Sequence, residues 1–250
     1  MKITAIVQEI KKKDELKNLE ESFIKERISD YTKKNSINLE SLDKRSSAYK
    51  ELFKTIRKKC FEVYGLFKQK SKDTLEEHIS SKERLEFYPR IYKEIFAITG
   101  KPKTILDLGC GLNPLSYKEL GCKPKYYASE LSNEDCNTIK EFFKENKIKG
   151  DVFAFDLLKE DYSTLPKVDV CFLFKVLESL EAIKRNISIE ILKSIPSKWI
   201  IVSFSKKTIT GRPIKKKGRS WLRRMLNELN YSYEIRDIGE EIFYIIKKLI

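Results

Sequence analysis

The stretch TILDLGCGLNPL, residues 104–115, decides the fold that we expect for this chain. Its first residues are mostly apolar and predict a buried strand that carries one carboxylate, Asp107. Gly109 and Gly111 follow, and glycines allow a sharp backbone turn and leave room for a ligand to approach the peptide groups. The stretch therefore predicts a strand, a ligand-binding turn and a helix, the opening unit of an α/β sheet.

A second carboxylate lies where a ribose-binding residue is expected. Glu130 ends the next predicted strand, about 20 residues beyond the glycine turn, and a carboxylate at that spacing can accept both hydroxyls of a ribose. The dinucleotide fingerprint requires a third small residue, but this turn contains Pro114 instead. The pattern therefore favours a nucleoside cofactor without phosphates, S-adenosylmethionine. The alternative is a glycine turn with a purely structural role.

The chain changes character near residue 100. Apolar residues recur at helical spacing in residues 3–10 and 42–64, whereas strands and helices alternate later. We expect a helical N-terminal subdomain at residues 1–100 and a cofactor-binding domain at residues 101–250. The predicted strands are 104–109, 125–131, 151–157, 168–176, 198–205, 232–238 and 241–249. The predicted helices between them are 114–120, 133–147, 182–194 and 216–230.

The alternation predicts a doubly wound parallel α/β sheet, and the last two strands predict a terminal hairpin. This is the seven-stranded arrangement typical of class I methyltransferases. The ligand of such a sheet lies at the carboxyl ends of the strands. In this prediction Asp107 faces the methionine part of the cofactor, Asp156 the adenine and Lys175 the methyl group. Each acidic residue could instead only cap the helix that follows it. The predicted cofactor-binding residues of this domain are Asp107, Gly109, Gly111, Asn113, Glu130, Leu131, Asp156, Leu157, Phe174 and Lys175.

The composition limits the class of protein and its location. Hydrophobic residues make up 41% of the 250 residues, enough for a core. No apolar stretch approaches the roughly 18 residues of a membrane span, and no signal-peptide pattern precedes the first lysine cluster. Five scattered cysteines and one histidine form no metal-ligand set. We therefore expect a cytoplasmic protein with free thiols, no metal and no membrane partner, present as a monomer.

The positive charge is concentrated in one segment. The formal net charge is +14, and residues 206–224 contain nine basic residues and no acidic one. Such a local excess favours a surface that binds a polyanion such as RNA, although a solvated lysine-rich loop is the alternative. The residues expected to bind RNA phosphates are Lys206, Lys207, Arg212, Lys215, Lys216, Lys217, Arg219, Arg223 and Arg224.

Four segments together resemble the aminoglycoside-resistance 16S rRNA guanine-N7 methyltransferases. They are DLGCGLNPL at 107–115, HISSKERL at 78–85, FLFKVLESL at 172–180 and VSFSKKTITGR at 202–212. The match covers about residues 55–215. It departs from the family pattern at Ser81, Glu178, Ser205 and Thr208, which leaves the target nucleotide more open than the cofactor.

The resemblance implies a function and one further cofactor contact. It implies methyl transfer to N7 of a guanine in the decoding-site helix of 16S rRNA, on the assembled 30S subunit, with the N-terminal helices helping to dock. It also implies that Arg84 reaches the carboxylate of S-adenosylmethionine.

Guanine N7 carries no proton, so its methylation requires positioning and no general base. We expect Lys175, Ser203 and Phe204 to position the base, with Phe204 either stacking on it or lying in the core. The chain lacks the D/N-P-P-Y/F motif of exocyclic-amine methylation and the Pro-Cys pair of pyrimidine methylation. The alternatives are a methyltransferase for tRNA or another structured RNA, and a ribosome-binding or assembly factor that keeps the cofactor fold without catalysis. A small-molecule methyltransferase would leave the basic segment unexplained.

Overall fold

A computed structural model of the chain describes residues 3–61, 84–159, 161–207, 214 and 219–248. The chain divides into two compact units, Met1–Ser71 and Lys72–Ile250. The division lies earlier than the expected one near residue 100, because helix α6 (Tyr88–Thr99) belongs to the second unit. The ring of Tyr92 in α6 stacks on Phe172 of the sheet, with 6.1 Å between ring centroids. Within the described residues, every helix is too short or too polar to cross a membrane.

The first unit is helical, as the spacing of its apolar residues predicts. Its elements are α1 (Ile3–Lys11), a 3-10 turn η1 (Asp14–Leu16), α2 (Glu21–Lys34) and α3 (Ser47–Cys60). Ser46 caps α3, because its hydroxyl accepts a hydrogen bond from the amide of Tyr49 at 3.1 Å. Apolar side chains from all three helices form a small core: Ile6, Val7, Ile10, Phe23, Ile24, Ile28, Leu52 and Ile56.

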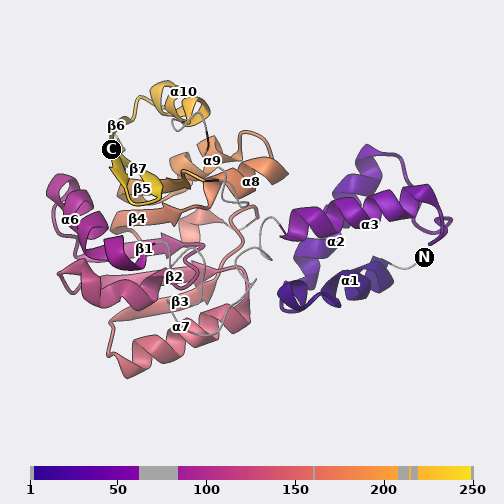
Figure 1. Ribbon diagram of the computed structural model, residues 1–250, viewed down its shortest axis with the longest axis horizontal. Helices are drawn as coiled ribbons and strands as arrows, with labels where there is room; N and C mark the ends of the chain where they lie inside the picture. Colours follow the sequence, from indigo (N-terminus) through magenta and orange to yellow (C-terminus); the bar gives the residue numbers. More distant parts are fainter. Residues whose placement is uncertain (1–2, 62–83, 160, 208–213, 215–218, 249–250) are drawn as a thin grey trace. The chain divides into compact units, whose positions relative to one another are not determined.

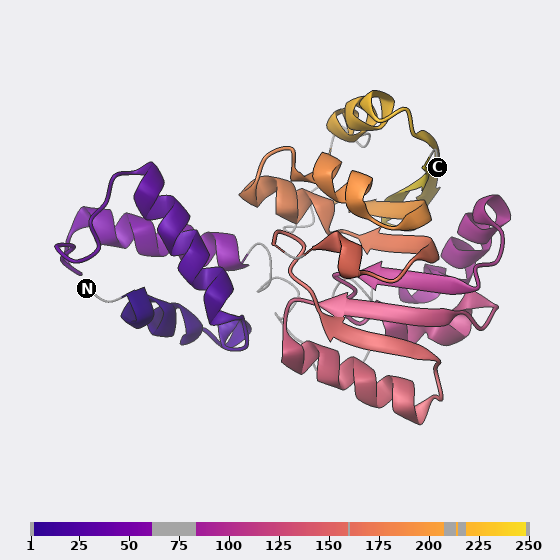
Figure 2. The same cartoon turned by 180° about the vertical axis from the view of Figure 1, so that it is seen from behind.

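The second unit is built on one sheet, in which the described residues form seven strands (Figures 1 and 2). The strands are β1 (Thr104–Leu108), β2 (Lys125–Glu130), β3 (Gly150–Ala154), β4 (Val168–Phe174), β5 (Ser197–Ser205), β6 (Ser232–Ile238) and β7 (Glu241–Lys247). Their order across the sheet is β3-β2-β1-β4-β5-β7-β6. The first five are parallel, and β7 is antiparallel to both β5 and β6. The predicted parallel sheet with a terminal hairpin is therefore confirmed.

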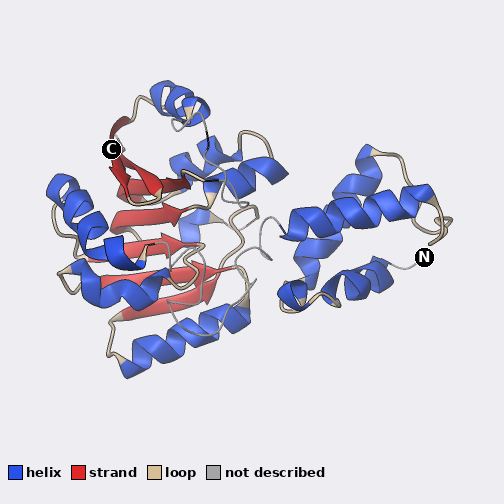
Figure 3. Ribbon diagram, viewed as in Figure 1, coloured by secondary structure: helices blue, strands red, loops and turns tan. Residues whose placement is uncertain are grey.

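Helices cover both faces of the sheet, as Figure 3 shows by secondary structure. Alternate residues of a strand point to opposite faces, so Cys171 and Leu173 of β4 join one core cluster and Phe172 and Phe174 join the other. On the first face lie α8 (Leu177–Ile183), α9 (Ile187–Ser194) and α10 (Ser220–Glu228). On the second lie α6, the 3-10 segment η4 (Asn113–Leu120) and α7 (Asn133–Glu145). Two further 3-10 turns are η3 (Leu85–Phe87) and η5 (Tyr162–Thr164).

One predicted helix is wrong in its bounds. The expected helix at 182–194 is interrupted: α8 ends at Ile183, and α9 begins at Ile187, directly after Asn186 with φ of +66°. The carboxylate of Glu181 holds this break, since it accepts hydrogen bonds from the amides of Asn186 and Ser188, each at 2.8 Å. The two helices contribute separate apolar residues to the same face of the sheet, Leu177 and Leu180 from α8 and Ile191 from α9.

Candidate functional site

Polar side chains gather where the parallel strands end. The carboxyl ends of β1, β2, β4 and β5 lie at one edge of the sheet, and the strand order reverses between β1 and β4. Ligands of open α/β sheets bind in the crevice at such a switch point. Strand β7 runs the opposite way, so its first residue, Glu241, pairs with Ser205, the last residue of β5. The antiparallel hairpin therefore adds a residue to this same edge.

Asp107 lies at the centre of the site and has no exposed surface. Its Oδ2 atom accepts two hydrogen bonds, from Asn113 Nδ2 at 2.8 Å and from the Tyr126 hydroxyl at 2.7 Å. Burial raises the pKa of Asp107 to about 6, although both hydrogen bonds and the charge of Arg84 oppose that shift. Burial disfavours the ionised form of this carboxyl group, and a cationic ligand group beside it would stabilise that ionised form.

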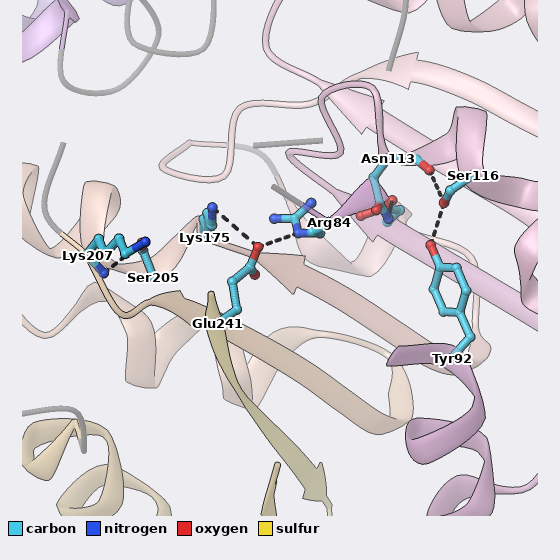
Figure 4. Close-up of polar contacts among 9 residues, drawn as sticks. Arg84, Tyr92, Asn113, Ser116, Lys175, Ser205, Lys207 and Glu241 are labelled. Atoms are coloured by element: carbon cyan, nitrogen blue, oxygen red, sulfur yellow. Dashed lines mark hydrogen bonds and ion pairs between the residues drawn. The ribbon is translucent and has the colours of Figure 1, made fainter. Parts of the chain in front are cut away.

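A chain of hydrogen bonds fixes Asn113 behind this carboxylate (Figure 4). The Ser116 hydroxyl donates to the carbonyl oxygen of Asn113 at 2.7 Å. Tyr92 lies 2.6 Å from the same hydroxyl oxygen, and because Ser116 has a single proton, the Tyr92 hydroxyl is the donor. Helix α6 thereby supports the start of η4, and the Asn113 side chain is held in one orientation.

Two buried acceptor atoms of this cluster fit a cation. Among the described residues, neither Asp107 Oδ1 nor Asn113 Oδ1 has a hydrogen-bond partner. Buried polar atoms are normally hydrogen-bonded, so two unsatisfied acceptors indicate a ligand with N–H donors. The adjoining turn requires a glycine at position 109, because this residue has φ of +62° and a Cβ there would lie 3.0 Å from Val176 Cγ2. The ammonium group of an S-adenosylmethionine fits these two acceptors.

Glu130 closes the next strand beside the glycine turn. Its carboxylate accepts hydrogen bonds from the amide of Gly111 at 2.5 Å and from the amide of Leu131 at 3.2 Å. Burial, together with the nearby charge of Asp135, raises the pKa of Glu130 to about 7. Each carboxylate oxygen has a second lone pair, so the side chain keeps the capacity to accept ribose hydroxyls.

A buried group of three charges lies on the other side of Asp107. Glu241 Oε1 accepts from Arg84 Nε at 2.6 Å and lies 3.3 Å from Lys175 Nζ (Figure 4). Burial alone would raise the pKa of the Glu241 carboxyl, but Arg84 and Lys175 outweigh burial and hold that pKa below its usual value. Lys175 has a left-handed backbone, with φ of +61°, and strained residues of this kind concentrate at functional sites. The guanidinium of Arg84 lies over the ring of Phe174, 5.1 Å from its centroid.

The predicted adenine-binding pair lies at the end of β3. Asp156 Oδ1 accepts from the amide of Leu158 at 2.9 Å, so this carboxylate caps a turn, as the alternative interpretation allowed. Its other oxygen, Oδ2, lies 3.7 Å from Lys159 Nζ. The Leu157 side chain is buried, and its Cδ1 would lie 3.9 Å from a Cβ on Gly109. Leu157 thus adjoins the glycine turn, and the role of both residues toward adenine stays a prediction.

The structure places some of the expected RNA-contacting residues elsewhere. Phe204 is 0% exposed and packs edge-on against Trp221 and Tyr244, so stacking on a base, one of its two expected roles, is wrong for this conformation. Ser203 is also fully buried. Arg219 is 5% exposed, and it donates to Glu178 Oε1 at 2.6 Å and to the Ser205 carbonyl at 3.0 Å. These contacts join the residue before α10 to α8 and to the end of β5, and they bury the guanidinium that was expected to bind a phosphate.

The exposed basic residues remain candidates for RNA contact. Lys207, Arg223 and Arg224 are exposed, and Lys207 Nζ lies 2.9 Å from Glu240 Oε2. Lys206 is partly buried and lies 2.5 Å from Asp237 Oδ1. Arg212, Lys215, Lys216 and Lys217 lie outside the described residues.

Sequence reasoning missed four residues of this site: Tyr92, Ser116, Tyr126 and Glu241. A glutamate at the start of the apolar run EIFYII, residues 241–246, is the one signal that could have been noticed. A charged residue that opens a buried strand needs a partner, and here the partners come from Arg84 and Lys175.

Comparisons with known proteins agree with this geometry. A family model described as ribosomal RNA methyltransferase (FmrO) matches residues 63–245. A 16S rRNA (guanine(1405)-N(7))-methyltransferase of Micromonospora echinospora is 30% identical over 184 residues, which cover 68% of this chain and 63% of the relative. A protein of the same name from Serratia marcescens is 30% identical over 185 residues, covering 71% of this chain and 70% of the relative. The chain thus spans less than two thirds of the Micromonospora echinospora relative.

Solved structures confirm the fold class. The 16S rRNA methyltransferase RmtF, in complex with S-adenosyl-L-homocysteine, has a TM-score of 0.80 and 20% identity, and the match covers 99% of this chain and 98% of RmtF. The 16S rRNA methylase RmtB has a TM-score of 0.74 and 20% identity, with coverage of 100% and 99%. At this identity the likeness shows the seven-stranded class I methyltransferase fold alone.

Proposed function

Because the chain belongs to the ribosomal RNA methyltransferase (FmrO) family, we propose that it transfers a methyl group from S-adenosylmethionine to N7 of a guanine in 16S rRNA. The family membership confirms the resemblance that the four sequence segments indicated. We further propose that the target lies in the decoding-site helix and is reached on the assembled small ribosomal subunit. The protein acts in this proposal as a monomer in the cytoplasm.

One observation carries the proposal: three kinds of polar group converge at the carboxyl edge of the sheet, and each fits a different part of the cofactor. Asp107 and Asn113 present unsatisfied acceptors within the described residues, which suit the ammonium group. Arg84 and Lys175 present buried cations, which suit the carboxylate. Glu130 suits the ribose hydroxyls. A zwitterionic amino acid joined to a nucleoside is complementary to this arrangement, whereas a dinucleotide with its pyrophosphate is not.

The chemistry requires little from the protein beyond placement. S-adenosylmethionine supplies an electrophilic methyl group when it is bound. The in-plane lone pair of guanine N7 forms the new carbon–nitrogen bond while the carbon–sulfur bond breaks and its electron pair stays on sulfur, so no proton is moved. The side chains of the site therefore act by binding, orienting and excluding water. The buried ring of Phe174, beside Arg84 and Lys175, provides an apolar wall at this end of the site.

The basic surfaces support an RNA substrate. In the second unit Lys207, Arg223 and Arg224 are exposed, and in the first unit α3 exposes Lys50, Lys54, Arg57 and Lys58. Such residues contact phosphates and set position on an RNA more than they read sequence. We propose that the helical N-terminal unit docks on the small subunit and that the second unit performs the transfer.

Methyl transfer from labelled S-adenosylmethionine to three substrates tests the proposal. Intact small subunits, protein-free 16S rRNA and bulk tRNA are incubated in parallel. We expect label in intact subunits and far less in the other two. Asp107→Asn should abolish the transfer, whereas Asp151→Asn, at an exposed carboxylate that is the second residue of β3, should leave it unchanged. Label in tRNA would support the alternative RNA substrate, and cofactor binding without label in any RNA would support a non-catalytic ribosome-binding factor.

A further inference from the structure

We infer that Glu241 is a positioning residue for the cofactor: it holds Arg84 and Lys175 in place so that their charges face the carboxylate of its amino-acid part. The inference rests on the proposed function, because it assigns a role to one residue within the proposed cofactor site. The sequence patterns that predict the glycine turn and the strand-end carboxylates do not include Glu241. The antiparallel pairing of β7 with β5 brings this residue to the site.

The contacts of Glu241 are close and buried. One of its oxygens, Oε1, lies 2.6 Å from Arg84 Nε and 3.3 Å from Lys175 Nζ. The exposed fractions of the three side chains are 2% for Glu241, 4% for Arg84 and 12% for Lys175. A buried ion pair restrains the positions of both side chains more than an exposed pair does. A buried charge that moves away from its partner has no water to solvate it. Glu241 therefore sets where both cations lie.

The two cations carry more donors than their contact with Glu241 uses. An arginine has five N–H groups and a lysine three, and both side chains meet Glu241 at one oxygen atom. Figure 4 shows Arg84 between Glu241 and Asn113, and the charge of Arg84 opposes the burial that raises the pKa of Asp107. The site thus has a positive side at Arg84 and Lys175 and an acceptor side at Asp107 and Asn113. That polarity matches an amino-acid zwitterion in one orientation.

The fold explains why this residue can hold the others. Arg84 precedes α6, Lys175 follows β4, and Glu241 opens β7, so three separate elements meet at one oxygen atom. The pairing of Glu241 with Ser205 ties it to the end of β5, and the amide of Lys175 donates to the Ser203 carbonyl on the same strand at 3.1 Å. The C-terminal hairpin therefore serves the cofactor site as well as the sheet.

A truncated ligand separates positioning from general support of the fold. S-adenosylhomocysteine contains the amino-acid part, whereas 5′-methylthioadenosine has the same nucleoside and sulfur but lacks the amino acid. Calorimetric titration of Glu241→Gln should show S-adenosylhomocysteine binding weakened by about tenfold or more, the effect of removing one charged hydrogen bond. The affinity for 5′-methylthioadenosine should stay within about twofold of the wild type, which is negligible on the same scale.

The neighbouring Glu240→Gln provides a matched control, because that carboxylate is 39% exposed and pairs with Lys207 outside the cluster. It should bind both ligands as the wild type does. If Glu241→Gln does not fold, Glu241→Asp keeps the charge but shortens the side chain that meets Arg84 and Lys175, and it should show the same selective loss. The inference is overturned if either variant binds S-adenosylhomocysteine normally or loses both ligands equally. A wild-type protein that binds neither ligand would overturn the proposed function as well.

Discussion

The backbone amide of Gly111 donates a hydrogen bond to Glu130 Oε1 at 2.5 Å, and this contact joins the glycine turn after β1 to the end of β2. The two residues are 19 positions apart in the chain, and the parallel pairing of β1 with β2 brings them together. A carboxylate held in this way is oriented before any ligand arrives. Its protonation state, and that of Asp107, then decides how well the site accepts ligand protons.

Cofactor affinity should rise with pH. Burial raises the pKa of Glu130 to about 7 and that of Asp107 to about 6, so both carboxyls are largely protonated at pH 5.5 and ionised at pH 8. The ionised forms accept from ribose hydroxyls and pair with an ammonium group, so binding favours them. Calorimetric titration with S-adenosylhomocysteine should show affinity increasing across this range. Glu130→Gln should remove the part of the increase near pH 7 and keep the part near pH 6. A pH-independent affinity would contradict this assignment.

Gly109→Ala should lower the free energy of unfolding and the cofactor affinity more than Gly121→Ala does. Gly109 and Gly121 have nearly the same φ, +62° and +63°, but a Cβ on Gly121 meets nothing within 4 Å. Gly121→Ala should therefore cost only the strain of a left-handed alanine, about 1 kcal/mol in the free energy of unfolding. Gly109→Ala adds the contact with Val176 Cγ2 at 3.0 Å and should cost about 1 kcal/mol more.

Urea unfolding and binding of S-adenosylhomocysteine measure the two effects. Only Gly109→Ala should also weaken ligand binding, because that turn adjoins the proposed cofactor site. Equal losses of stability and affinity in the two variants would show that the turn is not a close-approach site.

Tyr126→Phe should destabilise the protein through Asp107. It removes one of the two hydrogen bonds that Asp107 Oδ2 accepts among the described residues, and both partners are buried. Leaving part of a buried acceptor unsatisfied costs about 1–3 kcal/mol, which urea unfolding measures. Tyr127→Phe, one residue along β2, is the control: within the described part of the chain its hydroxyl has no hydrogen bond, and the free energy of unfolding should stay unchanged.

How far the sequence predicts the structure depends on whether a feature is local. The strand and glycine turn at residues 104–111 and the terminal hairpin follow from short patterns, and both are found. The break at Asn186 depends on a side chain, Glu181, that caps from five residues away, and the expected single helix missed it. Apolar spacing cannot distinguish a base-stacking phenylalanine from a core one, which is why Phe204 has two expected roles.

The contact least accessible to sequence reasoning is that of Arg84 with Glu241, since 157 residues separate them. Only the antiparallel insertion of β7 between β5 and β6 brings Glu241 to the carboxyl edge. Arg219 illustrates the converse, because a basic segment predicts an electrostatic surface but not which of its members turns inward to Glu178.

Reversing three exposed charges should weaken RNA binding without changing cofactor binding. Lys207, Arg223 and Arg224 all changed to glutamate should lower affinity for small-subunit rRNA. The dependence of affinity on salt should also become less steep, by about 0.7–0.9 in log–log slope for each phosphate that the protein no longer neutralises. Electrophoretic mobility shifts at several salt concentrations measure both. Reversal of Lys215, Lys216 and Lys217 should act in the same direction.

The matched control reverses Lys103, Lys149 and Lys198, which are equally exposed but lie at or next to the starts of β1, β3 and β5, the opposite edge of the sheet. This triple variant should retain most of the RNA affinity. If both triple variants lose affinity equally, binding follows net charge and there is no defined RNA surface at the carboxyl edge.

The identity of the methylated nucleoside tests the central claim most directly. Small subunits treated with the protein and S-adenosylmethionine are stripped to 16S rRNA, digested to nucleosides and analysed by mass spectrometry, with the Asp107→Asn variant as background. A site that positions a base and uses no general base should yield 7-methylguanosine as the new nucleoside. Methylation of an exocyclic amine or of a pyrimidine carbon would contradict the account, because the sequence lacks the D/N-P-P-Y/F motif and the Pro-Cys pair typical of those reactions.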